Sequence, residues 1–210
     1  VEAERTGSAV ACDVLDDAVL AERFPYFDFP AGTVGYHEAR GAGYISPRRL
    51  VAAQTAAAKR AGARVVEAVA TGVSETGAGV RVETDCGPVE AERVLVAAGG
   101  FTNMVLPDPL PITVYARTVA LFEIDEAEAA RLSGQPSMIY LGPGGEDPYL
   151  LPPIRYPDGR VYLKLGGDPE NRALADAEET RAWFRSGGSA EVADYLTEAV
   201  KRRMPGLAIR

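Results

Sequence analysis

The chain of 210 residues is poor in several residue types that common functional sites require. It has one histidine and two cysteines, which excludes a site built from several imidazole groups and a framework of disulfide bonds. Acidic residues outnumber basic ones, 30 against 22, and the net charge is -8. Because nucleic-acid binding depends on clustered positive charge, we expect no nucleic-acid partner.

The sequence also lacks long apolar runs. None approaches the roughly 18 residues that a membrane-spanning helix needs, so we expect no membrane partner. Two thiols without a disulfide framework indicate a reducing compartment, and we therefore expect a cytoplasmic protein. Residues 1–5 contain neither a start methionine nor a signal-peptide pattern, which favours a chain that begins within a longer protein.

The first half of the sequence predicts one clear helix. Ser46 and Pro47 are typical of a helix start, and Gly62 is typical of its end. Alternating and β-branched residues predict strands around this helix. We expect these strands at residues 63–69, at 80–83 with a return at 89, and at 93–98, the last buried on both faces of a sheet.

The second half mixes strands and helices. Asp125 and Glu128 form a capping box for a short helix, and residues 157–159 predict a turn. Periodicity gives the remaining elements. We expect strands at residues 112–124, 137–141, 149–155 and 160–165, and helices at 176–185 and 189–203.

Lysine usage singles out one position. The chain has 19 arginines and three lysines, Lys59, Lys164 and Lys201. Lys164 stands between two leucines at the end of a predicted strand, which favours a compact, desolvated ammonium group with a functional role. The alternative is that Lys164 faces solvent on the outer side of an alternating strand.

Self-contained catalytic motifs are missing. The sequence has no glycine loop of the kind that binds phosphates, no zinc-ligand spacing and no nucleophile elbow. We therefore expect no metal site. His37 is interpreted as a structural hydrogen-bonding residue, and Cys86 as incidental.

Several segments, taken together and in order, resemble one family, the FAD-dependent amine oxidoreductases of the D-amino-acid oxidase and sarcosine oxidase type. The residues that carry the resemblance cover most of the chain from about residue 20 onward. They are Gly43-Tyr44-Ile45-Ser46-Pro47, the strand-like 94–101, Leu121-Phe122-Glu123, Tyr149-Leu150-Leu151-Pro152, Leu163-Lys164-Leu165-Gly166 and Met204-Pro205-Gly206.

The resemblance implies roles for individual residues. Lys164 matches a lysine that lies beside the flavin ring and promotes its reaction with oxygen, and we expect it to be catalytic. Tyr149 matches a tyrosine region that lines the substrate pocket. The resemblance further implies that FAD is the cofactor and is contacted by Ala70, Thr71, Ala98 and Gly99.

Two departures from the family pattern limit the resemblance. Asp168 stands where the sarcosine oxidase branch has a histidine near the substrate, and an acid there favours a cationic amine over an anionic group. The family's phosphate-binding Gly-x-Gly-x-x-Gly turn and its closing flavin-contacting segment do not occur among these 210 residues. We therefore expect a middle fragment that is inactive alone.

The expected fold is a mixed α and β one, in which a mixed β-sheet substrate domain packs on part of a Rossmann-like FAD-binding domain. We expect a substrate-domain segment at 1–40, the partial FAD domain at 41–103 and the substrate domain at 104–210. The expected activity is oxidation of the C–N bond of an amine or N-alkyl amino acid, with hydride transfer to flavin and oxygen as acceptor. A dehydrogenase with another acceptor stays open, as does a non-catalytic binding or structural α+β domain that does not retain FAD.

Overall fold

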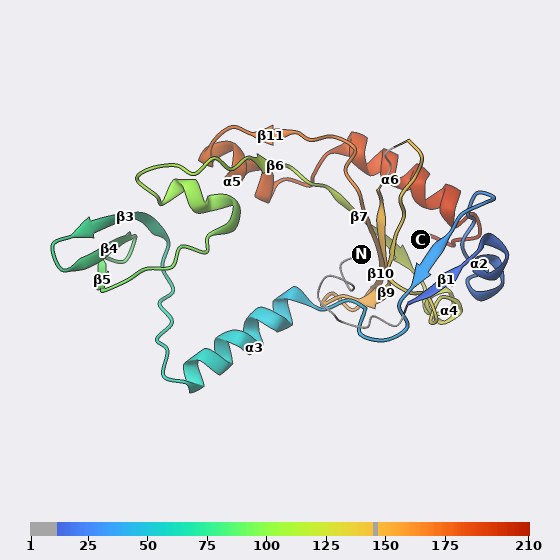
Figure 1. Cartoon of the computed structure of the whole chain (residues 1–210), viewed down its shortest axis with the longest axis horizontal. Helices are drawn as coiled ribbons and strands as arrows, with labels where there is room; N and C mark the ends of the chain where they lie inside the picture. The colour runs from blue at the N-terminus through green and yellow to red at the C-terminus, as the bar shows by residue number, and fades with distance from the viewer. Residues whose placement is uncertain (1–11, 145–146) are drawn as a thin grey trace. The chain divides into compact units, whose positions relative to one another are not determined.

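The computed structural model describes residues 12–144 and 147–210. It contains helices and several small antiparallel sheets, which confirms the expected mixed α and β class. The described chain divides into two compact units, coloured along the chain in Figure 1. The first unit consists of the residues up to 45 together with 117–169 and 188–210, and the second consists of 46–116 and 170–187. Their assignment as substrate and cofactor domains stays a prediction.

A four-stranded antiparallel sheet forms the centre of the first unit, in the order β7-β10-β9-β8. Helix α6 lies along this sheet (Figure 1) and contacts β7 and β10. The elements are β7 (Val119–Ile124), α4 (Glu126–Arg131), β8 (Met138–Ile139), β9 (Tyr149–Arg155), β10 (Val161–Gly166) and α6 (Ala190–Arg203). The unit also contains a two-stranded antiparallel sheet and one more helix. These are β1 (Asp13–Leu15), β2 (Gly35–His37) and α2 (Asp17–Arg23).

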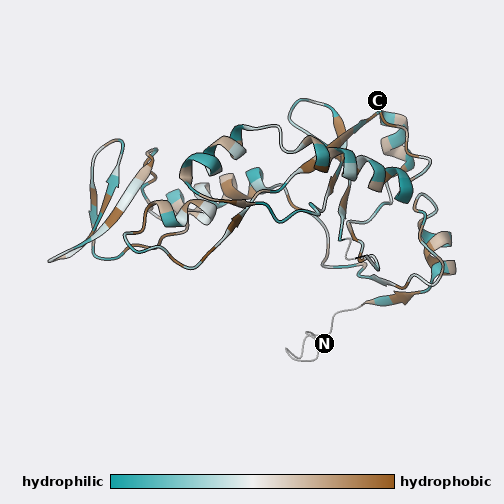
Figure 2. Ribbon diagram, turned by 90° about the horizontal axis from the view of Figure 1, so that it is seen from above, coloured by the Kyte–Doolittle hydropathy of each residue, from teal (hydrophilic) through white to brown (hydrophobic). Residues whose placement is uncertain are grey.

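Local side-chain chemistry sets the ends of these helices. The carboxylate of Asp125 accepts a hydrogen bond from the backbone N–H of Glu128 at 2.8 Å, which caps α4 as the sequence predicts. The hydroxyl of Ser189 accepts from the N–H of Val192 at 3.3 Å and caps α6 in the same way. Figure 2 shows that the helices carry both hydrophilic and apolar residues, which is typical of helices that bury one face.

The core of the first unit lies between the sheet and α6. Leu163 and Leu165 of β10 are buried, and they belong to the same apolar cluster as Leu196 and Val200 of α6. Since side chains alternate along a strand, burial of these two leucines places Lys164 on the opposite face of the sheet.

Strand β9 carries two consecutive prolines, Pro152 and Pro153, inside a sheet. Their position is explained by an irregularity in the pairing of β9 with β10, whose register shifts between Tyr162 and Lys164. A bulge of this kind removes ladder hydrogen bonds locally, so the missing N–H groups of proline are tolerated there.

The second unit contains a three-stranded meander, a two-stranded sheet and two α-helices. The helix predicted from Ser46 is confirmed as α3, in which the Ser46 hydroxyl accepts from the N–H of Arg49 at 3.4 Å. The elements are α3 (Pro47–Arg60), β3 (Ala70–Thr76), β4 (Gly79–Thr84), β5 (Val89–Ala91), a 3₁₀ helix (Gly99–Met104), β6 (Val114–Tyr115), β11 (Ala173–Leu174) and α5 (Ala177–Arg185).

Three expected strands are wrong or need correction. Residues 63–69 and 93–98 form no strand, and Leu95, expected to be buried on both faces, is 90% exposed. These segments have strand-like sequences, but they pair with no strand in the part of the chain that the structure describes. The expected strand at 112–124 is divided into β6 and β7, because its two halves pair with different partners, β11 and β10.

Candidate active site

The open face of the four-stranded sheet carries the lysine that the sequence singles out. Lys164 is directly paired with Leu121 of β7 on one side and with Leu151 of β9 on the other. Residues in direct register lie on the same face of an antiparallel sheet, so the ammonium group projects from an apolar row. Leu121 is 43% exposed, and Lys164 and Leu151 are half-buried, so this row is partly accessible in the described chain.

The lysine itself is half-buried, and its main described contact is with an aromatic ring. Its Nζ lies 5.6 Å from the ring centroid of Tyr149, a cation–π distance. No carboxylate forms an ion pair with Lys164 among residues 12–144 and 147–210. A cation in an apolar row without a paired anion is suited to stabilise negative charge that a ligand brings or that develops in a reaction.

Two glycines after Lys164 shape this face. Gly166 is paired directly with Tyr149, and a Cβ at Gly166 would clash with the tyrosine ring. Gly167 has φ +127°, and a Cβ there would lie 2.6 Å from Cα of Pro148. The missing side chain of Gly166 allows the Tyr149 ring to lie over β10, and that of Gly167 allows the backbone of Pro148 to approach closely.

Asp168 follows these glycines and is partly buried. Its Oδ2 accepts a hydrogen bond from the backbone N–H of Thr118 at 3.2 Å. The structure therefore brings Lys164, Tyr149 and Asp168 to one end of the sheet in the first unit. It does not test their expected roles, which stay predictions.

Tyr162 of β10 forms a local interaction with the turn that precedes the strand. Tyr162 donates its hydroxyl to Oδ2 of Asp158 at 2.8 Å. This hydrogen bond raises the pKa of Tyr162 above its ordinary value, with a smaller contribution from desolvation. The hydroxyl of Tyr162 is therefore held by the hairpin turn, whereas the ring of Tyr149 contacts Lys164.

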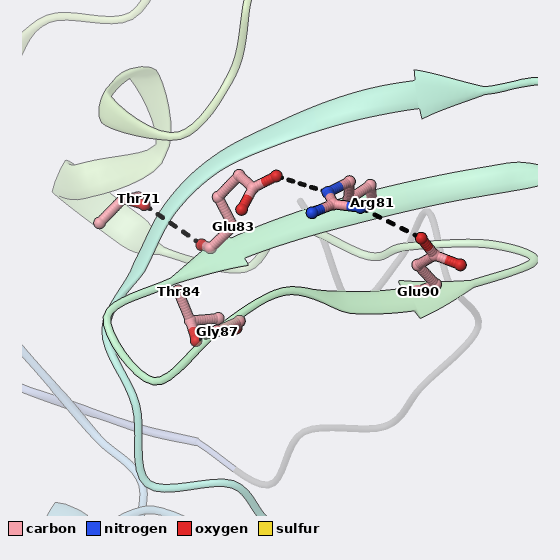
Figure 3. A network of polar contacts seen from close by, with 6 residues as sticks. All are labelled: Thr71, Arg81, Glu83, Thr84, Gly87 and Glu90. Atoms are coloured by element: carbon pink, nitrogen blue, oxygen red, sulfur yellow. Dashed lines mark hydrogen bonds and ion pairs between the residues drawn. The ribbon is translucent and has the colours of Figure 1, made fainter.

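The residues expected to contact FAD all lie in the second unit. Ala70 pairs with Thr84, and the hydroxyl of Thr71 donates to the carbonyl of Glu83 at 3.3 Å (Figure 3). Both residues are exposed. They lie at an irregularity of the β3–β4 pairing, between Ala70 and Gly72. At such a bulge the regular ladder of backbone hydrogen bonds between the strands is interrupted.

Ala98 and Gly99 lie at the start of the 3₁₀ helix. The carbonyl of Ala98 accepts from the N–H of Phe101 at 3.0 Å. Gly99 has φ +56°, and a Cβ there would meet no atom within 4 Å. Within the described chain, glycine at this position is explained by the left-handed backbone rather than by a close approach.

Charged side chains stabilise the meander that carries Thr71. Arg81 of β4 contacts Glu83 at 2.6 Å and Glu90 of β5 at 3.3 Å (Figure 3). These carboxylates, with the hydrogen bond to Glu83 as the largest cause, raise the pKa of Arg81 above its ordinary value. These ion pairs join β4 to β5 on an exposed face, and we interpret them as structural.

Sequence reasoning missed the surroundings of the lysine. The alternating residues of β7 could have indicated Leu121 as a neighbour of Lys164, because a residue on an adjacent strand lies beside each residue of β10. Nothing in the sequence signals Thr118, whose partner Asp168 is 50 residues away.

The described residues contain neither a metal-binding cluster nor a membrane-spanning helix. No group of three or more histidine, cysteine, aspartate or glutamate side chains in this part of the chain could hold a metal ion. No helix there is long and apolar enough to cross a membrane.

Comparisons with known proteins point to oxidoreductases. A family model described as DAO, FAD dependent oxidoreductase, matches residues 2–210. No curated protein matches the chain. The open form of NikD, described as an unusual amino acid oxidase essential for nikkomycin biosynthesis, is 20% identical with a TM-score of 0.68, over 99% of this chain and 52% of that one. L-proline dehydrogenase from P. horikoshii is 14% identical with a TM-score of 0.59, over 98% and 52%. These likenesses show the fold, and the chain spans about half the length of both structures.

Proposed function

The chain belongs to the DAO family of FAD-dependent oxidoreductases, and from this premise we propose that it is part of an enzyme that oxidises the C–N bond of an amine or N-alkyl amino acid. The proposed final electron acceptor is oxygen. The observation that carries the proposal is Lys164, a half-buried cation in an apolar row on an open sheet face, in contact with Tyr149.

The described residues fit a flat cofactor ring on this face. Leu121 and Leu151 offer apolar surface on either side of the ammonium group, and the positive charge suits an electron-rich edge of the ring. Bound FAD would supply the two-electron oxidation of the carbon beside the amine nitrogen and the later return of electrons to oxygen. Ala70, Thr71, Ala98 and Gly99 are proposed to contact FAD through backbone groups.

Each of the three polar residues has a distinct proposed role. Lys164 stabilises the negative charge that develops on oxygen as it is reduced, because a fixed cation is already oriented toward that charge. Tyr149 lines the substrate pocket and limits the positions that Lys164 can adopt. Asp168 adds negative charge at the same end of the sheet and favours a substrate with a cationic amine.

The proposed compartment is the cytoplasm, supported by the two exposed thiols, Cys12 and Cys86, which form no disulfide. The proposed partner is a small-molecule amine or amino acid. Because the chain spans about half of the compared structures, the activity is proposed for a protein that contains this chain.

The test uses the full-length enzyme with bound FAD and the variant Lys164→Met. Anaerobic stopped-flow absorbance should show that substrate still reduces the flavin, whereas reoxidation after mixing with oxygen should be slower by roughly 100-fold. The matched control is Lys201→Met, which removes an exposed lysine paired with Glu198 and should leave both rates unchanged. An unchanged oxygen reaction in Lys164→Met would overturn the proposed role of this lysine.

A further inference from the structure

We propose that Thr118 and Asp168 are positioning residues, which hold the end of β10 and thereby keep Lys164 against Tyr149. The proposal rests on the proposed function in one respect, namely that the position of Lys164 matters for the reaction with oxygen. We call the three residues Thr118, Asp168 and Ser189 the Thr118 clamp.

The Thr118 clamp joins three segments that are distant in sequence. Thr118 directly precedes β7, Asp168 follows β10, and Ser189 caps α6. The N–H of Thr118 donates to Oδ2 of Asp168 at 3.2 Å, and its Oγ1 accepts from the N–H of Ser189 at 3.0 Å. One threonine therefore connects the start of one strand, the end of the next and the start of the helix that covers the sheet.

Packing makes the Thr118 clamp specific for threonine or serine. Thr118 is only 5% exposed, so a lost hydrogen bond would leave the N–H of Ser189 poorly compensated by water. Gly188 has φ +85°, and a Cβ there would lie 2.9 Å from Cγ2 of Thr118. The threonine side chain thus fills space that the glycine leaves open.

The Thr118 clamp lies close to the points where the chain passes between its two compact units. The chain passes between its two compact units after residues 116, 169 and 187, in addition to a passage after 45. Thr118, Asp168 and Gly188 each lie within two residues of one of these three passages. Along the chain, the Thr118 clamp therefore lies between these three connections and the elements β7, β10 and α6.

Release of the clamp should first loosen the end of β10. Gly166 pairs with Val119, the residue after Thr118, and Lys164 pairs with Leu121 two positions further along. Without the hydrogen bonds of the Thr118 clamp, fraying would begin at Gly166 and proceed toward Lys164. Loss of the Gly166 pairing would also displace the ring of Tyr149, which lies over that glycine.

The test measures the chemical reactivity of the three lysines of this chain in the full-length protein that contains it. Competitive acetylation followed by peptide mass spectrometry resolves Lys59, Lys164 and Lys201 separately. In the unmodified protein, half-buried Lys164 should react more slowly than the two exposed lysines. Asp168→Ala removes the acceptor of the Thr118 N–H, and Thr118→Val removes the acceptor of the Ser189 N–H. In both variants the rate at Lys164 should rise about fivefold, with no change at Lys59 or Lys201.

Conservative variants separate positioning from general stability. Thr118→Ser keeps the Oγ acceptor and Asp168→Asn keeps a side-chain oxygen, so both should react as the unmodified protein does. Thr180→Val is the matched control, because Thr180 is a buried threonine whose hydroxyl donates to the carbonyl of Asp176 at 2.7 Å in α5. It should leave Lys164 unchanged.

Three results would overturn the positioning role. They are an unchanged rate at Lys164 in both Thr118→Val and Asp168→Ala, an equal rise at all three lysines, and the same rise in Thr180→Val. Where Thr118→Val does not fold, the comparison of Asp168→Ala with Asp168→Asn decides. The measurement needs no flavin, so failure of the proposed oxidase activity would leave its outcome intact.

Discussion

The aromatic ring of Tyr149 lies over the backbone of Gly166, its direct partner on the neighbouring strand. The same ring is 5.6 Å from the ammonium group of Lys164. One tyrosine therefore contacts both the glycine that makes room for it and the ammonium group of Lys164.

We predict that Gly166→Ala destabilises the chain by about 1–3 kcal/mol, because the new methyl group would clash with the tyrosine ring. In a Tyr149→Ala background the same change should cost at least about 1 kcal/mol less, since the clash is gone. Urea unfolding of the four proteins measures this coupling. Gly134→Ala, where a Cβ would meet no atom within 4 Å, is the control and should have an effect below about 0.5 kcal/mol. Additive costs of the two changes would contradict the contact.

Burial predicts that alanine substitutions at two leucines change the free energy of unfolding by very different amounts. Leu196 in α6 is 0% exposed, whereas Leu95 is 90% exposed. Leu196→Ala should lower the free energy of unfolding by about 2–5 kcal/mol through lost burial and a cavity. Leu95→Ala should change it by less than about 0.5 kcal/mol. Chemical denaturation of the 210-residue chain checks both values, and a large loss in Leu95→Ala would show that residues 93–98 are buried in solution.

A buried carboxylate ties the end of the chain to α4. Glu128 accepts two hydrogen bonds from Arg131, at 2.6 and 2.7 Å, and a third from the N–H of Ala208 at 3.2 Å. Glu128→Gln should destabilise the chain by about 1–3 kcal/mol because charge-assisted bonds are weakened. Glu198→Gln, which breaks the exposed pair with Lys201, should cost less than about 1 kcal/mol.

The carboxylate of Glu128 also predicts how the stability of the chain changes as the pH falls. The hydrogen bond from Arg131, above all, holds the pKa of Glu128 below its ordinary value. A lowered folded-state pKa contributes stability that is fully present above the unfolded value of about 4.3 and is lost as the pH falls through the lower folded value. The difference in unfolding free energy between the unmodified chain and Glu128→Gln should therefore shrink below about pH 4. A difference that grows as the pH falls would contradict this assignment.

The elements that the sequence predicted well are those with local causes. The caps at Ser46 and Asp125 act within three residues, so the starts of α3 and α4 could be derived from short motifs. The division of residues 112–124 could not, because it depends on the distant partner strands β11 and β10. Strand-like sequence at 63–69 and 93–98 likewise indicated a tendency to extend, but pairing decides whether a strand forms.

The candidate site shows the same limit. The scarcity of lysine was enough to single out Lys164 from the sequence. The apolar row on which it lies needed the register of three strands, and the Thr118 clamp needed contacts across 50 and 71 residues. A single sequence contains no direct signal for contacts of that separation.

The two prolines of β9 have a consequence for behaviour in concentrated solution. Strand β8 pairs only with Tyr149 and Leu150 of β9, so residues 151–155 form a sheet edge within the described chain. At Pro152 and Pro153 this edge offers no amide hydrogen to another extended peptide. Adhesion of a second molecule by strand addition is therefore blocked at the margin of the sheet that bears Lys164.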